Sequence, residues 1–405
     1  MGLAGSQPVA VDHFTGTRRA DYPHSAMRYE HVALAACGYC LPPEIVSSAE
    51  LEQRLDPLYQ RLRLPAGRLE LMSGIRARRL WSPGTLPSDK SIVSGRHALQ
   101  ASGLDPAHVG ALIHASVCRD HLEPATACKV HHALGLPAEC FVYDVSNACL
   151  GLLNGVLQVA NMIELGQIRA GLVLGSEGSR QLVEATIDQL NRDTTLTRGA
   201  VKPALASLTI GSASAAILLV QRSLRPAAPR LLAAARRAHS AHHGLCQSGQ
   251  DEAAADGMRP LMATDSERLL EEGVATGLAT WNEFLNRSGW ERSQIDKTVC
   301  HQVGSAHRRR MLEAFGLVAE RDFATYEWLG NTGAVALPVS LARAAEQQWL
   351  AAGDRVALLG IGSGINCLMM ALEWGEAAVA GTDEAAEEGK AMGSRAGGMA
   401  AVSGS

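Results

Sequence analysis

Cys149 stands where a strand-like apolar run, Phe141–Val145, gives way to a helix-like segment that starts at the cysteine itself. A thiol at the start of a helix faces unpaired backbone N–H groups and the positive end of the helix dipole, and both favour the thiolate. The position of Cys149 therefore predicts a nucleophile. Cysteine is also among the most buried residue types, so a structural thiol is the alternative.

His301 and Asn331 weigh against that alternative, because each lies in a polar turn flanked by glycine. His301 ends a strand-like run just before a helix. Asn331 lies between Gly330 and Gly333, and glycine lets the backbone approach a ligand closely. A histidine and an amide together can hold the carbonyl of a thioester and stabilise the enolate that forms from it. Neither needs to be a metal ligand.

A fourth segment, Gly360–Gly364, follows a strand-like run late in the chain. The backbone N–H groups of its Gly-Ser-Gly portion could pair with the N–H of Cys149 to form an oxyanion hole. A phosphate loop is the alternative, but the segment lacks the Gly-Lys-Ser/Thr ending and the full dinucleotide pattern. We therefore assign it to the oxyanion hole.

Short β-type runs alternate with helix-like stretches between the two ends of the chain, and this alternation predicts an α/β domain with helices covering a mixed sheet. The expected strands are Val109–Val117, Phe141–Val145, Ala170–Gly175, Ser214–Val220, Lys297–His301 and Arg355–Gly360, and the expected helices include Cys149–Leu165 and Ala306–Phe315.

The chain also repeats itself coarsely, because each half contains an apolar strand that leads into a turn of small residues. We expect two pseudo-symmetric halves, residues 30–221 and 222–374, whose strand ends bring the reactive turns to one place. Residues 1–29 and 375–405 are polar or of low complexity. They bury too little apolar surface to offset chain entropy, so we expect a flexible extension and a disordered tail.

Composition narrows the partners and the compartment. The 405 residues carry a net charge of −4, and the chain has no run of Lys and Arg apart from the short Arg308–Arg310. Nothing in the charge pattern therefore indicates nucleic acid as a partner. Nine cysteines, an odd number with irregular spacing, indicate a reducing compartment rather than a disulfide framework. No signal peptide or transmembrane segment is recognisable. We expect a cytoplasmic protein.

The four segments around Cys149, His301, Asn331 and Ser363, in this order, resemble the thiolase superfamily and are most similar to its β-ketoacyl synthase III branch. The resemblance covers roughly residues 31 to 374. It implies a five-layered αβαβα fold, a homodimer, Cys149 as acyl acceptor, and His301 with Asn331 activating the second thioester. It also implies oxyanion-hole N–H groups from Cys149 and Ser363.

Glu123 distinguishes this chain from the synthases that use malonyl thioesters. Those enzymes usually carry an apolar residue before the proline of this loop, and an asparagine shortly after the catalytic His-Gln, where this chain has Val303-Gly304. A carboxylate before Pro124 resembles the OleA family of bacterial long-chain olefin biosynthesis, as do Gly74–Trp81 and Gly362–Cys367. In that family the glutamate enters the active site of the partner subunit.

The extra carboxylate has a chemical reason. Decarboxylation of a malonyl thioester creates an enolate without a base, whereas joining two ordinary acyl thioesters requires removal of an α-proton. Glu123 is the predicted base, and a helix-capping or solvated glutamate beside Pro124 is the alternative. We predict non-decarboxylative Claisen condensation of two fatty acyl-CoA molecules through acyl-Cys149, with no metal or redox cofactor. The 2-alkyl-3-ketoacyl product would pass to downstream lipid-biosynthesis enzymes.

Four other functions stay open from the sequence. A β-ketoacyl synthase III that uses acyl-CoA and a malonyl thioester would share Cys149, His301 and Asn331. A hydroxymethylglutaryl-CoA synthase also combines cysteine, histidine and glutamate, on short acyl units. A degradative thiolase typically has a second cysteine where this chain has Leu358-Leu359. An inactive acyl-binding scaffold is the fourth, and the intact reactive residues disfavour it.

Three arginines, Arg76, Arg78 and Arg79, could bind the phosphates of CoA, and a solvated basic strand edge is the alternative. Cys37 and Cys40 have a redox or zinc spacing, but no second pair follows, so we expect buried thiols in the first strand.

Two pairs of adjacent histidines, His131-His132 and His242-His243, lack a companion carboxylate or cysteine at a convincing spacing. We expect surface or loop histidines there and assign no metal.

Overall fold

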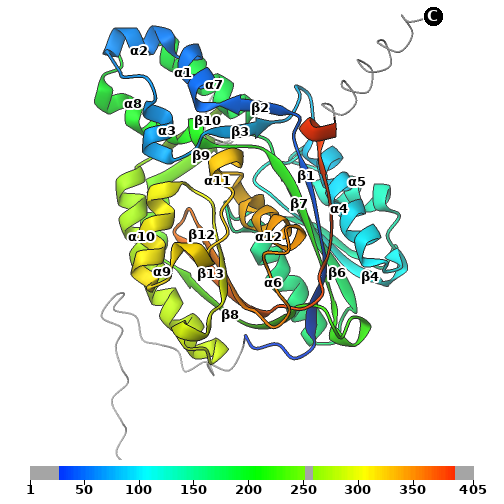
Figure 1. Ribbon diagram of the computed structural model, residues 1–405. Helices are drawn as coiled ribbons and strands as arrows, with labels where there is room; N and C mark the ends of the chain where they lie inside the picture. The colour runs from blue at the N-terminus through cyan, green and yellow to red at the C-terminus, as the bar shows by residue number, and fades with distance from the viewer. Residues whose placement is uncertain (1–26, 251–258, 388–405) are drawn as a thin grey trace, which may run out of the picture.

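The computed structural model describes residues 27–250 and 259–387 (Figure 1). The predicted strands and helices are present, each with ends within two residues of the expected ones. They are β4 (Val109–Ala115), β5 (Phe141–Val145), β6 (Ala170–Glu177), β7 (Ala213–Gln221), β11 (Lys297–Cys300), β12 (Arg355–Gly362), α6 (Gly151–Glu164) and α10 (Ser305–Phe315).

The strands form one mixed sheet in the order β11-β12-β13-β8-β1-β7-β6-β4-β5. It also includes β1 (Val32–Leu41), β8 (Arg230–Ala238) and β13 (Asn366–Glu373). The order β4-β6-β7-β1 in the first half recurs as β11-β12-β13-β8 in the second. In both sets the first pairing is parallel and the next two are antiparallel. This repeat confirms the predicted pseudo-symmetry of the two halves.

Three hydrophobic cores separate five layers of secondary structure. The middle core encloses α6 and α12 (Ala336–Glu346). A second core lies between the first half of the sheet and helices α4 (Pro87–Ser102) and α5 (Thr126–Leu134), and a third lies under α9 (Ser266–Ser288) and α10. Along β13, Leu368 and Met370 face the middle core while Met369 faces the third, as strand alternation requires. The αβαβα fold predicted from the resemblance is therefore confirmed (Figure 1).

A cap of short elements lies on one end of the layered body, at the upper left of Figure 1. Its apolar centre contains Leu51, Leu55, Leu58, Val183 and Ile187. The elements are β2 (Glu44–Ser47), α1 (Ser48–Arg54), α2 (Asp56–Leu62), α3 (Arg68–Ser73), β3 (Ala77–Leu80), α7 (Arg180–Arg192) and α8 (Arg198–Leu205), together with the hairpin of β9 (Cys246–Gln250) and β10 (Arg259–Thr264).

The predictions for the two chain ends are wrong for the parts that the structure describes. Met27 and Tyr29 are buried, and Arg28 bridges to Ala233 of β8. At the other end Ala378–Asp383 forms β14, which pairs in parallel with β1. Packing against β1 supplies the burial that the composition of this segment alone does not. Residues 1–26 and 388–405 lie outside the described part of the chain.

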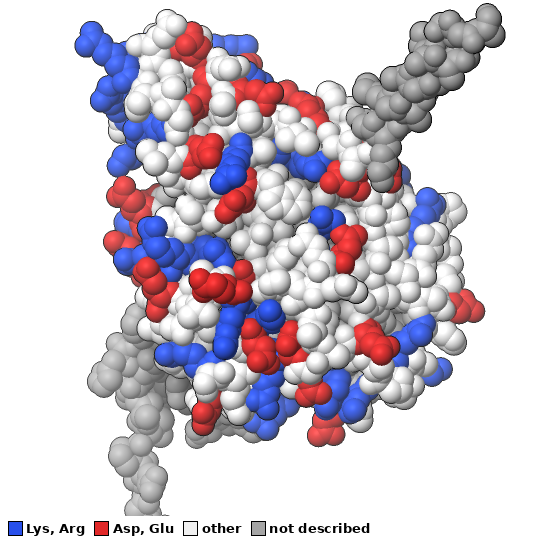
Figure 2. Space-filling view, viewed as in Figure 1, with Lys and Arg blue, Asp and Glu red and all other residues white. Residues whose placement is uncertain are grey.

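All nine cysteines are free, and Cys37 and Cys40 are buried in β1 as expected. Burial raises the pKa of the Cys37 thiol to about 12. Among the residues that the structure describes, no helix is both long and apolar enough to span a bilayer. Acidic and basic side chains intermingle on the face shown in Figure 2.

Candidate active site

The chain makes a tight turn at Cys149 between β5 and α6. The helix begins at Gly151, so Cys149 precedes the N-cap residue, Leu150. The N–H of Leu150 donates to the carbonyl of Asn147 at 2.9 Å, and Ala148 adopts a left-handed conformation with φ of 43°. An alanine in that region costs about 1 kcal/mol or more, so the surrounding packing must hold this turn.

The thiol of Cys149 is protonated at neutral pH. Burial raises its pKa to about 12, and the neighbouring Cys246 and Glu177 raise it further, against a smaller opposing effect of the cysteine's own N–H. In this structure the desolvation of the charge therefore outweighs the stabilisation of a thiolate that the helix start offers.

The hairpin between β12 and β13 packs directly on the Cys149 turn. A Cβ atom placed on Gly362 would lie 3.3 Å from the Leu150 side chain, 3.4 Å from the Cys149 nitrogen and 3.5 Å from the Cys149 Cβ. The small size of glycine lets the two segments lie this close together. The contact brings the backbone next to Ser363 beside Cys149, which is the arrangement that the predicted oxyanion hole needs.

A chain of side-chain amides joins the same two segments. Asn366 Nδ2 donates to Asn147 Oδ1 at 3.3 Å, and Asn147 Nδ2 donates to Asn154 Oδ1 at 2.7 Å. These hydrogen bonds therefore fix the positions of the hairpin, the Cys149 turn and the start of α6 relative to one another.

His301 immediately follows β11, and its backbone N–H donates to the Leu359 carbonyl of β12 at 3.0 Å. The side chain is 4% exposed, and neither ring nitrogen has a hydrogen-bond partner among the described residues. Burial lowers the pKa of His301 to about 3, with a further lowering from His307. His301 is therefore neutral and can serve a substrate as donor or acceptor.

Gln302 fixes the turn that carries His301. Its Nε2 donates to the Cys300 carbonyl at 2.6 Å, and its Oε1 accepts from the N–H groups of Thr325 and Tyr326 at 2.9 and 3.2 Å. These two residues start α11 (Tyr326–Leu329), which leads directly to Asn331. The hydrogen bonds of Gln302 thus connect the turn that carries His301 to the segment that carries Asn331.

Asn331 is oriented by its own turn. The N–H of Gly333 donates to Asn331 Oδ1 at 3.0 Å, while the Asn331 backbone is bonded to Thr209 and Gly211 at 2.9 Å each. Because Oδ1 already accepts this bond, the Nδ2 group is left to donate. The role of Asn331 as an amide donor to the substrate stays a prediction.

Glu123 lies in the loop between β4 and α5 and is exposed. Within the described part of this single chain, no hydrogen bond or ion pair joins it to Cys149, His301 or Asn331. Its neighbour Leu122 is 60% exposed. The loop therefore presents a carboxylate and an apolar side chain outward.

Only one of the three candidate CoA-binding arginines is exposed. Arg76 is open to solvent, whereas Arg78 is fully buried and donates to Ser48 Oγ at 3.0 Å. Arg79 makes a bidentate pair with Asp383 at 2.8 and 3.0 Å. This arrangement gives no support to phosphate binding by Arg78 and Arg79, because both guanidinium groups are used inside the protein.

Three residues near the site were not identified from the sequence: Glu177, Cys246 and His307. Cys246 and Glu177 raise the pKa of Cys149, and His307 lowers the pKa of His301, so each lies within electrostatic range of a reactive group. Burial lowers the pKa of His307 to about 4. A charged residue at the end of a buried strand was a usable signal for Glu177, but the other two carry none.

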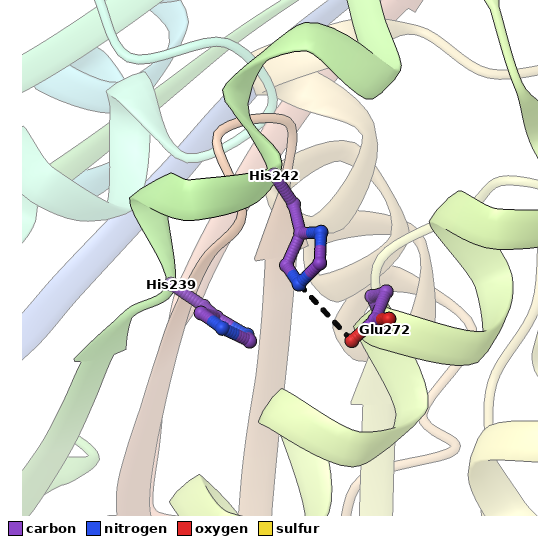
Figure 3. A group of neighbouring side chains, drawn as sticks. All are labelled: His239, His242 and Glu272. Carbon is purple, nitrogen blue, oxygen red and sulfur yellow. Dashed lines mark ion pairs between the residues drawn. The ribbon is translucent and has the colours of Figure 1, made fainter. Parts of the chain in front are cut away.

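His239, His242 and Glu272 form a separate group whose potential ligand atoms all lie within 4.8 Å of one another (Figure 3). His242 Nε2 and Glu272 Oε2 are 3.2 Å apart, and Thr276 Oγ1 lies 3.4 Å from His239 Nδ1. Two imidazoles and a carboxylate suit zinc. The sequence pattern missed this grouping because Glu272 lies on α9, far along the chain from the histidines.

Two family models match the chain. The N-terminal domain of thiolase matches residues 89–257, and the C-terminal domain of 3-oxoacyl-[acyl-carrier-protein] synthase III matches residues 285–374. With the repeated strand order and the reactive turns, these matches define a condensing enzyme of the thiolase superfamily.

Relatives that this chain matches over nearly their whole length show which family of condensing enzymes it belongs to. An acyl-CoA:acyl-CoA alkyltransferase of Shewanella oneidensis is 44% identical over 351 residues, which is 86% of this chain and 100% of the relative. One from Xanthomonas campestris pv. campestris is 33% identical with the same coverage. A β-ketoacyl-[acyl-carrier-protein] synthase III of Streptomyces coelicolor is 26% identical, over 84% of this chain and 96% of that protein. The chain belongs to the acyl-CoA:acyl-CoA alkyltransferase family.

Solved structures agree with this assignment. A variant of Xanthomonas campestris OleA with bound lauric acid and lauroyl-CoA is 33% identical, with a TM-score of 0.81 over 85% of this chain and 100% of that one. The cerulenin-bound form of that protein is 32% identical, with a TM-score of 0.82 over 88% of this chain and 100% of that chain. The predicted resemblance to the OleA family is confirmed.

Proposed function

We propose that this protein joins two fatty acyl-CoA molecules by a Claisen condensation that releases no carbon dioxide and gives a 2-alkyl-3-ketoacyl product. The observation that carries the proposal is the 44% identity to a relative named acyl-CoA:acyl-CoA alkyltransferase, over the whole length of that relative and 86% of this chain. Glu123 supports the same choice over a malonyl-using synthase, because only the non-decarboxylating reaction needs a base for the α-carbon.

The first step is acylation of Cys149. Its sulfur attacks the carbonyl carbon of an acyl-CoA, the bond from that carbon to the CoA sulfur breaks, and the thiol proton of Cys149 leaves with CoA. The N–H groups of Cys149 and Ser363 stabilise the oxyanion that forms in between. Because burial keeps both Cys149 and His301 neutral, the thiol loses its proton during the attack rather than before it.

The second step forms the carbon–carbon bond. Glu123 of the partner subunit removes an α-proton from a second acyl-CoA, while His301 and the Nδ2 group of Asn331 stabilise the enolate oxygen. The carbanion attacks the acyl group on Cys149, the carbon–sulfur bond breaks, and the released thiolate is reprotonated with the proton held by Glu123. Atoms and electrons balance without a metal or a redox cofactor.

A homodimer is part of this proposal, since Glu123 is exposed in the single chain. The strand β5 lies at the edge of the sheet, and its Phe141 is 51% exposed. Val117 and Leu122, on the Glu123 loop, are also largely exposed. An unpaired edge strand with apolar neighbours is suited to a contact with a second copy.

We also propose a cytoplasmic location, which the nine free cysteines support.

Replacing Glu123 separates the two steps. Glu123→Ala should release one equivalent of CoA and accumulate acyl-Cys149, while condensation falls by about 100- to 10,000-fold, the usual contribution of a general base. Mass spectrometry of the intact protein and of the products measures both. Glu139→Ala, at an exposed glutamate in the same half, is the matched control. Normal condensation by Glu123→Ala would refute the base assignment.

A further inference from the structure

Glu177 is a buried carboxylate at the end of β6, 5% exposed, for which the reaction above has no role. An ionised group in such a place is stable only when hydrogen bonds replace its water. Its Oε1 accepts from the N–H groups of Val117 and Ala334 at 3.0 and 3.2 Å, and its Oε2 accepts from the N–H of Cys118 at 3.2 Å.

These donors belong to two different parts of the catalytic machinery. Val117 and Cys118 begin the loop that carries Glu123. Ala334 lies in a single helical turn, Gly333–Val335, that begins two residues after Asn331. A single carboxylate therefore joins the loop of the predicted base to the turn of the predicted enolate donor.

The packing around the carboxylate is close on the Asn331 side. Gly333 has φ of 56°, and a Cβ atom placed there would lie 3.1 Å from the Glu177 Cγ. The N–H of Gly333 also holds Asn331 Oδ1. Movement of the Glu177 side chain would therefore shift the segment that orients the Asn331 amide.

Glu177 is itself held firmly. Its carbonyl accepts from Trp81 Nε1 at 3.0 Å, and the preceding Ser176 carbonyl accepts from Ser116 Oγ at 2.7 Å. Just beyond it, the N–H of Gly178 lies 3.4 Å from Cys118 Sγ. Residues 176–178 at the end of β6 are thus hydrogen-bonded to residues 116–118 at the start of the Glu123 loop, and the Glu177 carboxylate makes the middle contacts.

We propose that Glu177 is a positioning residue that couples the two active sites of the dimer. Its carboxylate sets the Asn331 turn of its own site and, through Val117 and Cys118, the loop whose Glu123 serves the partner's site. This inference rests on the proposed action of Glu123 across the dimer interface. A change at Glu177 in one subunit therefore affects condensation in both sites.

Heterodimers with two affinity tags test the two halves of this statement separately. One subunit carries Cys149→Ala and supplies Glu123; the other carries Glu123→Ala and supplies Cys149. Only the mixed dimer then contains a complete site, so all condensation measured comes from it. If this parent heterodimer is inactive although wild-type dimers condense, the cross-subunit function fails before Glu177 is tested.

Glu177→Gln is then added to one subunit at a time. The amide still accepts at one oxygen but turns an N–H₂ group toward the N–H of Cys118. On the Glu123-supplying subunit it should slow condensation by about 10- to 100-fold, as expected for a misplaced catalytic group. Acylation of Cys149 in the other subunit should not change. On the Cys149-supplying subunit it should slow condensation as well, through Asn331.

Glu184→Gln, at a half-exposed glutamate of α7, is the control in each position, and it should leave condensation unchanged. A Glu177→Gln effect confined to the Cys149-supplying subunit would overturn the coupling, and so would condensation within about twofold of the parent in both positions.

A second variant guards against misfolding. Glu177→Asp keeps the carboxyl group but draws it back by one methylene. Hydrogen exchange of residues 117–125 and 331–335 should accelerate together in the wild-type-sized dimer of this variant, while exchange in α9 stays as it was. Acceleration in only one of the two segments, or in neither, would contradict the link.

Discussion

Burial sets the charge of the two central reactive side chains. The pKa of Cys149 rises to about 12 and that of His301 falls to about 3, in both cases because desolvation penalises the charged form. The resting site therefore holds a thiol and a neutral imidazole, not an ion pair. A neutral imidazole keeps one N–H group, which can donate a hydrogen bond to an enolate oxygen.

The raised pKa of Cys149 predicts how its reactivity depends on pH. The thiolate fraction, and with it the alkylation rate by iodoacetamide, should rise about tenfold per pH unit from pH 7 to 9 without a plateau. Peptide mass spectrometry distinguishes Cys149 from its neighbour Cys246, and the exposed Cys128 serves as an internal control for the reagent. A rate that is constant over this range would show a thiolate already present.

Among single residues, the sequence pointed to those whose neighbours in the chain form a recognisable pattern. Cys149, His301 and Asn331 each follow a strand-like run or lie between glycines. A charge at the end of a buried strand marks Glu177 as unusual, but the pattern does not show its partners, which are N–H groups 60 and 157 residues away in the chain. Contacts of that kind exist only once the sheet has formed.

Helices and strands with a regular pattern of apolar residues could be predicted from the sequence. Elements that form only by pairing with a distant strand could not. The strand β14 lies in a segment whose composition indicated disorder. It is ordered by pairing with β1 and by the bidentate pair between Asp383 and Arg79. Burial alone would raise the pKa of Asp383, but Arg79 holds it below the ordinary value of 3.8.

Asp383→Asn should lower the free energy of unfolding by about 1–3 kcal/mol at pH 7, since a charged hydrogen bond to a mostly buried guanidinium is lost. The lowered pKa means that the ionised form stabilises the fold above about pH 4, so the difference from wild type should shrink as pH falls below that value. Thermal unfolding at pH 7 and pH 3.5 measures this. Asp188→Asn, which breaks an exposed pair with Arg192, should have little effect; equal effects of the two would contradict the account.

The segment at Ser240–Leu245 and helix α9 bring together the histidines and the glutamate of Figure 3. The proposed reaction has no step for a metal, so treatment with a chelator followed by desalting should leave the condensation rate unchanged. Loss of activity that zinc restores would contradict this, and loss of that restoration in His242→Ala but not in the exposed His243→Ala would assign the site to this group.

At the scale of the whole molecule, one continuous sheet brings turns that are distant in the sequence to the same region. The β12–β13 hairpin contacts the β5–α6 turn that carries Cys149, and the end of β11, which carries His301, is hydrogen-bonded to Leu359 of β12. The coarse repeat of an apolar strand and a turn of small residues indicated two halves, and their bounds stay a prediction. It did not indicate how closely β12 approaches Cys149, because that depends on glycines facing a residue more than two hundred positions away.

The most direct test of the account is to supply the purified protein with a single long-chain acyl-CoA and no malonyl donor. Free CoA and the products are then followed by thiol assay and mass spectrometry. Catalytic release of CoA, with a 2-alkyl-3-keto acid or the ketone formed when that acid loses carbon dioxide, is the predicted result. Stoichiometric acyl-Cys149 alone, with turnover only after a malonyl thioester is added, would contradict it and assign a decarboxylating synthase instead.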